Sequence, residues 1–248
     1  MKKLLFALAT ALSCLSAGAA AITLTGTVRD FNADGVNFEG SIVSGAGYVN
    51  NPMLGTSPML TATGSSVISN SGAGAFDNWY TNTANSMAYS ITLNETAPGS
   101  GIYQYASNSF FPIDGALLGN QGRAHNYHFT YAIASMFSYV PGAGQLFTFT
   151  GDDDVWVFFD KMLGVDLGGV HGAQTQTVNL DTLMAGKPAG DYAFDFFFAE
   201  RHTTQSNLVI TTSLILRDTP SQVPEPASLA LIGLALVGVA AVRRRKVV

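Results

Sequence analysis

Three consecutive carboxylates form the densest acidic group in the chain. Asp152, Asp153 and Asp154 follow Gly151 and precede an apolar run at 155–159. Neighbouring carboxylates repel one another, and a hard cation such as Ca²⁺, which takes six to eight oxygen ligands, relieves that repulsion. We therefore predict a calcium site at Asp152, Asp153 and Asp154. The alternative is a solvated acidic turn, because Asp is common in turns.

A second candidate metal site lies near the start of the chain. Asp30, Asn32 and Asp34 follow the spacing of the first half of a calcium loop, D-x-[DN]-x-[DN]-G. An EF-hand also needs a Glu at the twelfth loop position, where Ser41 stands, and a helix before the loop, whereas residues 22–28 look like a strand. An EF-hand is therefore excluded. A calcium loop of another kind or a turn rich in Asn and Asp remains.

The histidines do not form a catalytic set. His125 and His128 are three residues apart, and residues 127–131 alternate as in a strand, so the two side chains are expected on opposite faces. His171 and His202 lie in segments rich in turn-forming or polar residues, where local hydrogen bonding is expected. The chain has no nucleophile elbow, zinc-protease or phosphate-loop motif, and its spacing gives no carboxylate pair for glycan hydrolysis. We expect a protein that is not an enzyme, with no catalytic residues.

The elements that position these residues are predicted to be β-strands. Apolar and polar residues alternate at 87–93, 192–198 and 208–216, as in half-buried strands. Residues 155–159 form a continuous apolar run, which suits a strand covered on both faces. Only residues 181–185 suggest a helical turn. The pattern predicts an all-β antiparallel sandwich.

Two further expectations concern polar residues of this sandwich. Residues 41–85 are rich in Gly, Ser, Asn and Thr without a strict repeat, so we expect loops and short strands that wrap the sandwich. Asp195 lies within an aromatic strand and is expected to pair with Arg201 or another donor.

Composition restricts the possible functions. The 248 residues include 12 Lys and Arg, 17 Asp and Glu, and one Cys, which excludes a disulfide scaffold and a Cys-rich zinc module. Six of the twelve basic residues lie outside residues 22–222, which keep sixteen acidic residues, so this region carries a net charge near −10. An acidic domain of this kind is not expected to bind nucleic acid.

The first residues have the pattern of a secretory signal peptide. Two lysines precede an apolar run at 4–15, and small residues follow at 17–21. We expect residues 1–21 to be a signal peptide, cut after Ala19 or Ala21. The alternative, lipidation of Cys14, is disfavoured because an alanine occupies the position where a lipobox has Leu.

The last residues have three parts. Pro224-Glu225-Pro226 ends a linker at 218–226, an apolar run follows at 227–242, and four basic residues come next. Sixteen apolar residues make about 24 Å of helix against a hydrocarbon core of about 30 Å, so a short transmembrane helix with a cytoplasmic basic end is predicted within 227–248.

This arrangement resembles the PEP-CTERM sorting signal of Gram-negative bacteria. The resemblance implies recognition of Pro224, Glu225 and Pro226 by an exosortase, transient anchoring in the inner membrane, and delivery to the cell surface or extracellular matrix. An ordinary C-terminal anchor is the alternative.

Several motifs within residues 26–216 resemble the fibro-slime domain of surface and matrix proteins, which is similar to the PA14 β-sandwich. They lie at 28–39, 76–80, 110–115, 125–130, 147–159, 166–171, 179–183, 197–201 and 206–214. The resemblance implies a PA14-like domain over 22–217. It also implies Ca²⁺ at Asp152 and Asp153 across a cis peptide, with sugar hydroxyls completing the shell. One departure is Asp160-Lys161, where the family usually has an Asn-Gly or Asp-Gly hairpin.

Together these features predict an exported cell-surface or matrix protein with Ca²⁺-dependent adhesion or glycan binding. Its expected partners are an exosortase and an exopolysaccharide or other glycan. The alternative is a structural biofilm-matrix protein whose calcium is purely structural and which binds no glycan.

Overall fold

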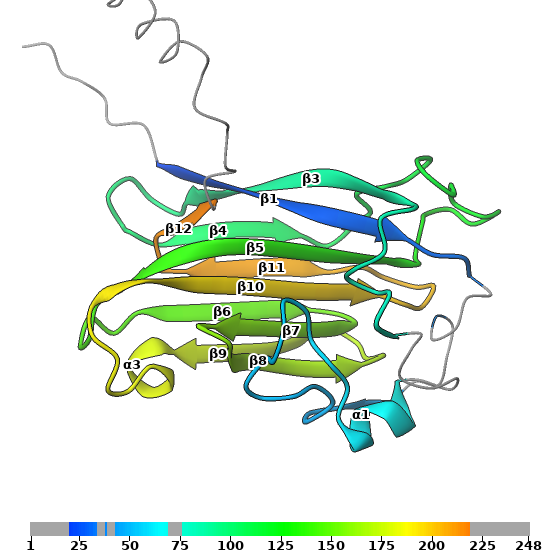
Figure 1. Cartoon of the computed structure of the whole chain (residues 1–248). Coiled ribbons are helices and arrows are strands. Elements are labelled where there is room, and N and C mark those ends of the chain that lie inside the picture. Colours follow the sequence, from blue (N-terminus) through cyan, green and yellow to red (C-terminus); the bar gives the residue numbers. More distant parts are fainter. Residues whose placement is uncertain (1–19, 34–37, 39–42, 69–75, 219–248) are drawn as a thin grey trace, which may run out of the picture. The chain divides into compact units, whose positions relative to one another are not determined.

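The computed structural model describes residues 20–33, 38, 43–68 and 76–218 (Figure 1). Contacts divide the chain into two compact units, residues 1–217 and 218–248, and the description below concerns the first. Most of the predicted signal peptide, the motif Pro224-Glu225-Pro226, the predicted C-terminal helix and Asp34 lie outside the described residues. Within the described ranges, no helix has the length and apolar character that crossing a membrane requires.

The described part of the chain is built from β-strands with two short helices. The helices are α1 (Ala62–Val67) and α3 (Leu180–Leu183). The strands are β1 (Ala21–Asp30), β2 (Ser44–Gly45), β3 (Ser86–Glu95), β4 (Tyr103–Ser107), β5 (Phe129–Tyr139), β6 (Leu146–Gly151), β7 (Asp154–Phe159), β8 (Met162–Gly169), β9 (Gln174–Asn179), β10 (Gly190–Glu200), β11 (Leu208–Thr212) and β12 (Leu216–Asp218).

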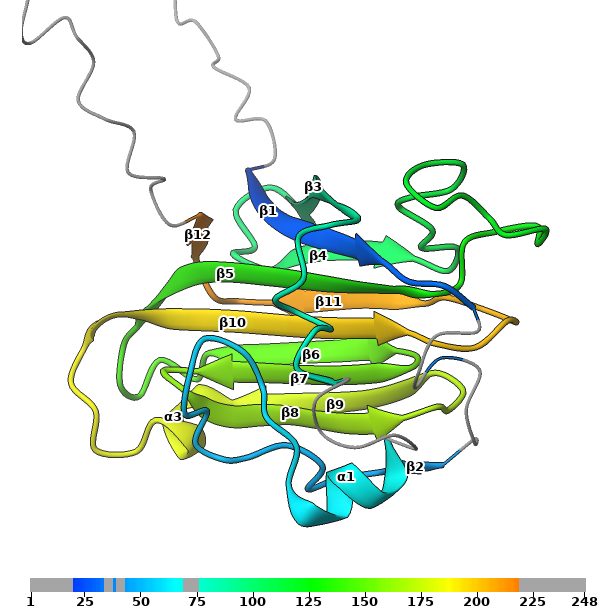
Figure 2. The ribbon, with the colours of Figure 1, turned by 45° about the vertical axis from the view of Figure 1, so that its right-hand side comes forward.

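The strands form one sheet that curls into two layers. Its order is β2-β8-β7-β10-β5-β1-β3-β4-β11-β6-β9, and β12 pairs with β5. Figure 2 shows β4, β11 and β6 behind the layer of β1, β5, β10 and β7. Gln176 of β9 links the two layers because its Oε1 accepts from the Asp166 N–H (2.8 Å) and its Nε2 donates to the Gly164 carbonyl (3.2 Å), both on β8. The predicted all-β antiparallel architecture is confirmed.

Aromatic side chains fill the space between the layers. Phe194 and Phe196 of β10 point inward, and their rings lie 5.5 Å from Phe147 and 5.9 Å from Phe149 of β6. Phe159 of β7 lies 5.5 Å from both Phe147 and Phe194. All five are fully buried. The alternation predicted at 192–198 therefore places every second aromatic ring of β10 in this core.

A second apolar cluster covers the outer face of β7 and β10. Trp156 and Phe158 point outward, and the Trp156 ring lies 5.8 Å from that of Phe76. Phe38 and described residues of the 43–68 and 76–80 segments complete this cluster. All six residues of β7 are buried, so the continuous apolar run was correctly predicted to be a strand covered on both faces.

The turn between β7 and β8 keeps the conformation that Asn-Gly would favour, although neither residue is Gly. Asp160 and Lys161 have φ values of 50° and 66°, as in a tight hairpin with two left-handed central residues. Lys187 contacts the Asp160 carboxylate at 2.6 Å. Asp160-Lys161 therefore replaces the usual Asn-Gly or Asp-Gly of this turn, but the backbone still forms the same kind of tight hairpin.

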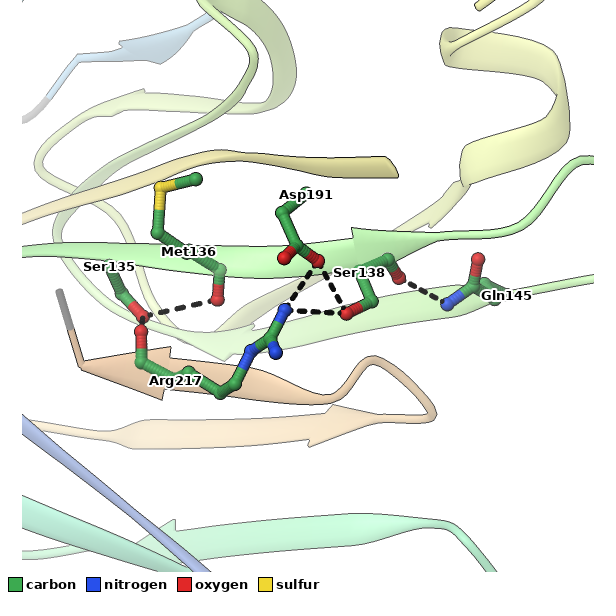
Figure 3. Close-up of polar contacts among 6 residues, drawn as sticks. All are labelled: Ser135, Met136, Ser138, Gln145, Asp191 and Arg217. Carbon is green, nitrogen blue, oxygen red and sulfur yellow. Dashed lines mark hydrogen bonds and ion pairs between the residues drawn. The ribbon is translucent and has the colours of Figure 1, made fainter. Parts of the chain in front are cut away.

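Polar contacts hold the last described strand at one end of the sheet (Figure 3). Arg217 of β12 donates from Nη2 to the Ser138 hydroxyl (2.7 Å) and to the Asp191 carboxylate, while its carbonyl accepts from the Ser135 hydroxyl (2.6 Å). Gln145 donates to the Ser138 carbonyl (2.8 Å). Hydrogen bonds from Ser138 and the Arg217 charge lower the pKa of Asp191.

We expect Arg217→Met to loosen β12 without unfolding the sheet. The variant should show faster amide exchange at Ser138, whose N–H bonds the Ile215 carbonyl, because β12 loses its side-chain contacts to β5. Hydrogen exchange read by mass spectrometry checks this. Lys187→Met, which removes a different, partly exposed ion pair, is the matched control and should leave that amide unchanged. Equal exchange in both variants would contradict this role of Arg217.

Candidate functional site

Asp152 and Asp153 line a pocket at one end of the strands. The pocket has a volume of about 170 Å³ and lies where β6, β7, β8 and β10 meet their connecting loops. In Figure 2 this is the right-hand end of the sheet, where β10 leads into the loop to β11. Its polar lining residues are Asp152, Asp153, His171, His202, Thr204 and Gln205.

Asp152 is fixed by the residue that precedes β11. Its two carboxylate oxygens accept from the backbone N–H and the side-chain amide of Asn207, both at 2.7 Å. The side chain is almost fully buried. The preceding Gly151 allows this contact, because a Cβ there would lie 2.2 Å from the Asn207 carbonyl oxygen.

Asp153 is held by two backbone groups from different strands. Its oxygens accept from the N–H groups of His171, just after β8, and Arg201, just after β10, both at 3.1 Å. Burial raises the pKa of Asp153 to about 7, and the charge of Asp154 adds to this; the two N–H donors and the Arg201 charge only partly offset it. The peptide between Asp152 and Asp153 is cis, as the resemblance implies.

The structure places Asp154 apart from the other two carboxylates. As the first residue of β7 it is fully buried, and its oxygens contact Arg201 Nη1 (3.1 Å) and the Gly169 N–H. The Arg201 guanidinium also lies 5.3 Å from the Trp79 ring. Among the described residues, no three His, Cys, Asp or Glu side chains gather as a metal-ligand set. The structure therefore pairs Asp154 with Arg201 and leaves Asp152 and Asp153 at the pocket.

The sequence predicted that Asp195 pairs with Arg201 or another donor, and the structure tests this. Arg201 pairs with Asp154, while Asp195 lies on β10 near the positive charge of Lys161. The predicted pairing with Arg201 is wrong, because six residues along an extended chain separate the two by about 20 Å, and no other donor to Asp195 is found among the described residues.

Glu200 was missed by the sequence analysis. It is the last residue of β10, it is fully buried, and neither carboxyl oxygen has a hydrogen-bond partner among the described residues. Burial raises the pKa of Glu200 well above its ordinary value, and the charges of Asp153 and Asp152 raise it further, while the nearby Ser206 hydroxyl and His202 N–H offset this only in part. The only sequence signal was a charged Glu200-Arg201 pair after an aromatic strand. The pocket therefore has a third acid group behind its two aspartates.

The second predicted metal site is not brought together by the described residues. Asp30 is buried, and its oxygens accept from the Asn126 amide (2.9 Å) and the Leu118 N–H (2.8 Å). Burial raises the pKa of Asp30 in spite of these bonds. Asn32 is exposed, and Asp34 lies outside the described ranges. Asp30 therefore holds the loop that precedes β5.

The two neighbouring histidines occupy different environments. His125 contacts the Asp114 carboxylate through Nδ1 at 2.6 Å and stacks on Phe111 with ring centroids 4.0 Å apart. His128 is buried, with its ring edge-on to Phe38 at 6.0 Å. The two rings therefore do not form a pair, as predicted. The local hydrogen bonding predicted for His171 is seen between its Nδ1 and the Gly172 carbonyl (2.9 Å).

The carboxyl-terminal residues match a known sorting signal. Residues 222–246 fit the family model of the PEP-CTERM protein-sorting motif. The predicted sorting signal is thus confirmed, and the chain carries an address for export and sorting to the surface of a Gram-negative cell.

Curated relatives come from Dictyostelium discoideum. Protein psiQ is 42% identical over 176 residues, which are 64% of this chain and 17% of psiQ. Protein psiC is 45% identical over 153 residues, which are 57% of this chain and 29% of psiC. The chain therefore spans less than a third of the length of these relatives.

Two solved structures are similar to this fold. The PA14 sugar-binding domain from an RTX adhesin is 10% identical, with a TM-score of 0.36 over 79% of this chain and 96% of that domain. The PA14 domain of the MpAFP antifreeze protein is 13% identical, with a TM-score of 0.36 over 82% of this chain and 86% of that domain.

Proposed function

We propose that this chain is an exported surface or matrix protein that binds Ca²⁺ at Asp152 and Asp153 and uses the ion for adhesion or glycan binding. We further propose that an exosortase processes the chain at Pro224-Glu225-Pro226 after transient anchoring in the inner membrane. No step of this proposal requires catalysis by the chain.

The observation that carries the proposal is a pair of buried carboxylates that converge on one pocket. The donors that contact Asp152 and Asp153 are the Asn207 amides and the backbone N–H groups of His171 and Arg201. These are uncharged groups, while the charged Asp154 and the acid Glu200 lie close by. Buried carboxylates without full compensation favour either protonation or a bound cation.

The chemistry of the pocket suits calcium better than a transition metal. Carboxylate oxygens are the ligands that Ca²⁺ prefers, and it accepts six to eight of them in flexible geometry. Asp152 and Asp153 would supply the charged ligands. Because the described residues offer no third carboxylate to the same point, backbone carbonyls, water and the hydroxyls of a ligand would have to complete the shell. This need for outside oxygens is what supports a glycan partner.

The position of the pocket also supports a role in adhesion. Asp153 contacts residues at the end of β10 marked by Glu200, whereas Arg217 contacts Asp191 at the opposite end of the same strand. Eleven residues of strand span about 35 Å. Figure 1 shows the start of β1 near β12, at that opposite end. The pocket therefore lies at the end of the sheet away from β12, where the loops after β6, β8 and β10 come together.

Calcium titration of the full chain tests the proposal. We expect Ca²⁺ to raise the melting temperature and EGTA to reverse this, and Asp153→Asn to weaken calcium binding at least tenfold because a charged ligand is lost. Asp77→Asn is the matched control, because Asp77 is an exposed residue outside the pocket lining. Calorimetry with Ca²⁺ measures the affinity. Equal calcium affinity in wild type and Asp153→Asn would refute the site.

Binding to a glycan array, with calcium or with EGTA, separates the proposal from its alternative. A functional ion predicts glycan binding that EGTA and Asp153→Asn both abolish. A structural ion predicts a lower melting temperature for Asp153→Asn with no separable binding defect. The second result would favour a structural matrix protein that binds no glycan itself.

A further inference from the structure

A second hollow lies on the outer face of the sheet, away from the calcium pocket. It is a groove of about 360 Å³ over β1, β5 and β10, within the size range of ligand sites. The segment after Trp79 crosses this face in front of β10, β5 and β1 on its way to β3 (Figure 2). Two hydrogen bonds fix that crossing, from the Thr130 hydroxyl to the Trp79 carbonyl and from Arg29 Nε to the Asn82 carbonyl (2.8 Å).

Small side chains make the floor of the groove. Ala132 of β5 faces Thr27 of β1 on one side and Phe197 of β10 on the other, and Ala134 faces Asp195. Side chains two residues apart on a strand share a face, and so do residues paired directly across neighbouring strands. The side chains of all these residues therefore point to the same side of the sheet. The Phe197 ring packs against Tyr80, with centroids 4.9 Å apart, and these tall rings beside short alanines produce the hollow.

Asp195 is the acidic group that lines this groove. No hydrogen bond or ion pair to its carboxylate is found among the described residues, although the side chain is partly buried. Burial raises the pKa of Asp195 to about 6, and only the charge of Lys161 acts in the other direction. A partly desolvated carboxylate that lines a groove gains free energy from a ligand that donates hydrogen bonds.

Arg29 supplies donors at the other end of the groove. Its Nε and Nη1 donate to the carbonyls of Asn82 and Thr27, which orients the guanidinium and uses two of its five N–H groups. Arg29 of β1 faces Thr130 of β5, and Asp195 of β10 faces Ala134, four residues farther along β5. Four residues along the strands correspond to about 13 Å. One acceptor and one donor group therefore lie at opposite ends of an uncharged floor.

We propose that this groove is a second, calcium-independent binding site for a neutral oligosaccharide. Sugar hydroxyls can donate to Asp195 and accept from Arg29, while the C–H face of a sugar ring packs on the methyl groups of Ala132 and Ala134. A polyanion would be repelled by Asp195 and a polycation by Arg29, so a neutral ligand satisfies both ends. The distance between the two ends suits several linked sugar units.

The test uses the full chain in EGTA, which removes any calcium-dependent binding at Asp153. The probes are neutral hexasaccharides (cellohexaose, maltohexaose and xylohexaose), with a galacturonic acid hexamer and a glucosamine hexamer as charged comparators. Calorimetry should show binding of at least one neutral probe. Ala134→Leu, which fills the exposed floor, and Asp195→Asn, which removes the charged acceptor, should each raise its Kd at least tenfold.

Matched controls separate the groove from general effects. Ala106→Leu adds the same side chain at an exposed position of β4, and Asp77→Asn removes an exposed carboxylate elsewhere, so both should bind as wild type does. The proposal is overturned if no neutral hexasaccharide binds in EGTA, if a charged probe binds more tightly than every neutral one, or if Ala134→Leu leaves the Kd unchanged. If Asp153→Asn loses calcium-dependent glycan binding but still binds the neutral probe in EGTA, the result supports two separate sites.

Discussion

Replacing Arg201 by methionine is expected to lower the free energy of unfolding by about 3–5 kcal/mol, because it leaves the buried Asp154 carboxylate without its cationic partner. The Arg201 and Asp154 side chains are 3% and 0% exposed, and their charged atoms lie 3.1 Å apart. The guanidinium also loses its position 5.3 Å from the Trp79 ring. Urea denaturation measures the change.

The double variant Asp154→Asn, Arg201→Met provides the control. Removing both charges abolishes the unpaired buried carboxylate, so the double variant should be more stable than Arg201→Met alone. Lys187→Met removes the partly exposed pair with Asp160 and should cost much less, because solvent reaches both of its side chains (42% and 30% exposed) and surface pairs contribute roughly 0–1 kcal/mol. If Arg201→Met and Lys187→Met had similar stabilities, Asp154 would not depend on Arg201 as the structure indicates.

The Asp154–Arg201 pair also shows how far the sequence could predict the candidate site. Three adjacent aspartates looked like one ligand set. The third is the first residue of β7, and the alternation of strand side chains turns it away from the pocket. Its partner is 47 residues away in sequence, beyond the end of β10, and no local pattern connects the two. The run of three aspartates therefore indicated where the pocket lies, but the sequence could not show which of the three side chains point into it.

The strands themselves were predictable because a period of two is a local property. The aromatic alternation of β10 and the continuous apolar run of β7 were visible without any knowledge of the fold. Glu200 was not predictable in the same way. Its burial depends on pairing with Phe129 and on the loops that close over the end of β10, which are long-range features. The same holds for the outer groove, which exists because a segment far away in sequence crosses over short side chains.

Asp153 should give the calcium-free protein an unusual dependence of stability on pH. Its pKa is about 7 in the folded chain and 3.8 ordinarily, so between about pH 4 and 7 the folded state keeps a proton that the unfolded state has released. Stability in EGTA should therefore fall as the pH rises through this window. Each pH unit corresponds to about 1.36 kcal/mol, so the full effect approaches roughly 4 kcal/mol.

Asp153→Asn has no carboxylate to titrate at this position and should lose most of that slope. The part that remains belongs to the other acids whose pKa the fold raises, which are Glu200, Asp195 (pKa about 6), Asp30 and Asp166. Asp77→Asn should follow wild type, because Asp77 is exposed and lies outside the pocket lining. Urea denaturation in EGTA at a series of pH values from 5 to 8 measures each slope. Parallel slopes for wild type and Asp153→Asn would contradict the assignment.

Calcium should replace the proton in this balance. Above pH 7 the folded, calcium-free chain carries an ionised Asp153 beside Asp154 and the acid Glu200, which is the state that burial disfavours most. A bound cation stabilises that ionised form, so the gain in stability on adding Ca²⁺ should be larger at pH 8 than at pH 5, where protons compete for the same oxygens. A calcium effect equal at both pH values would mean that the ion binds elsewhere, because only a site that includes Asp153 couples its occupancy to this proton.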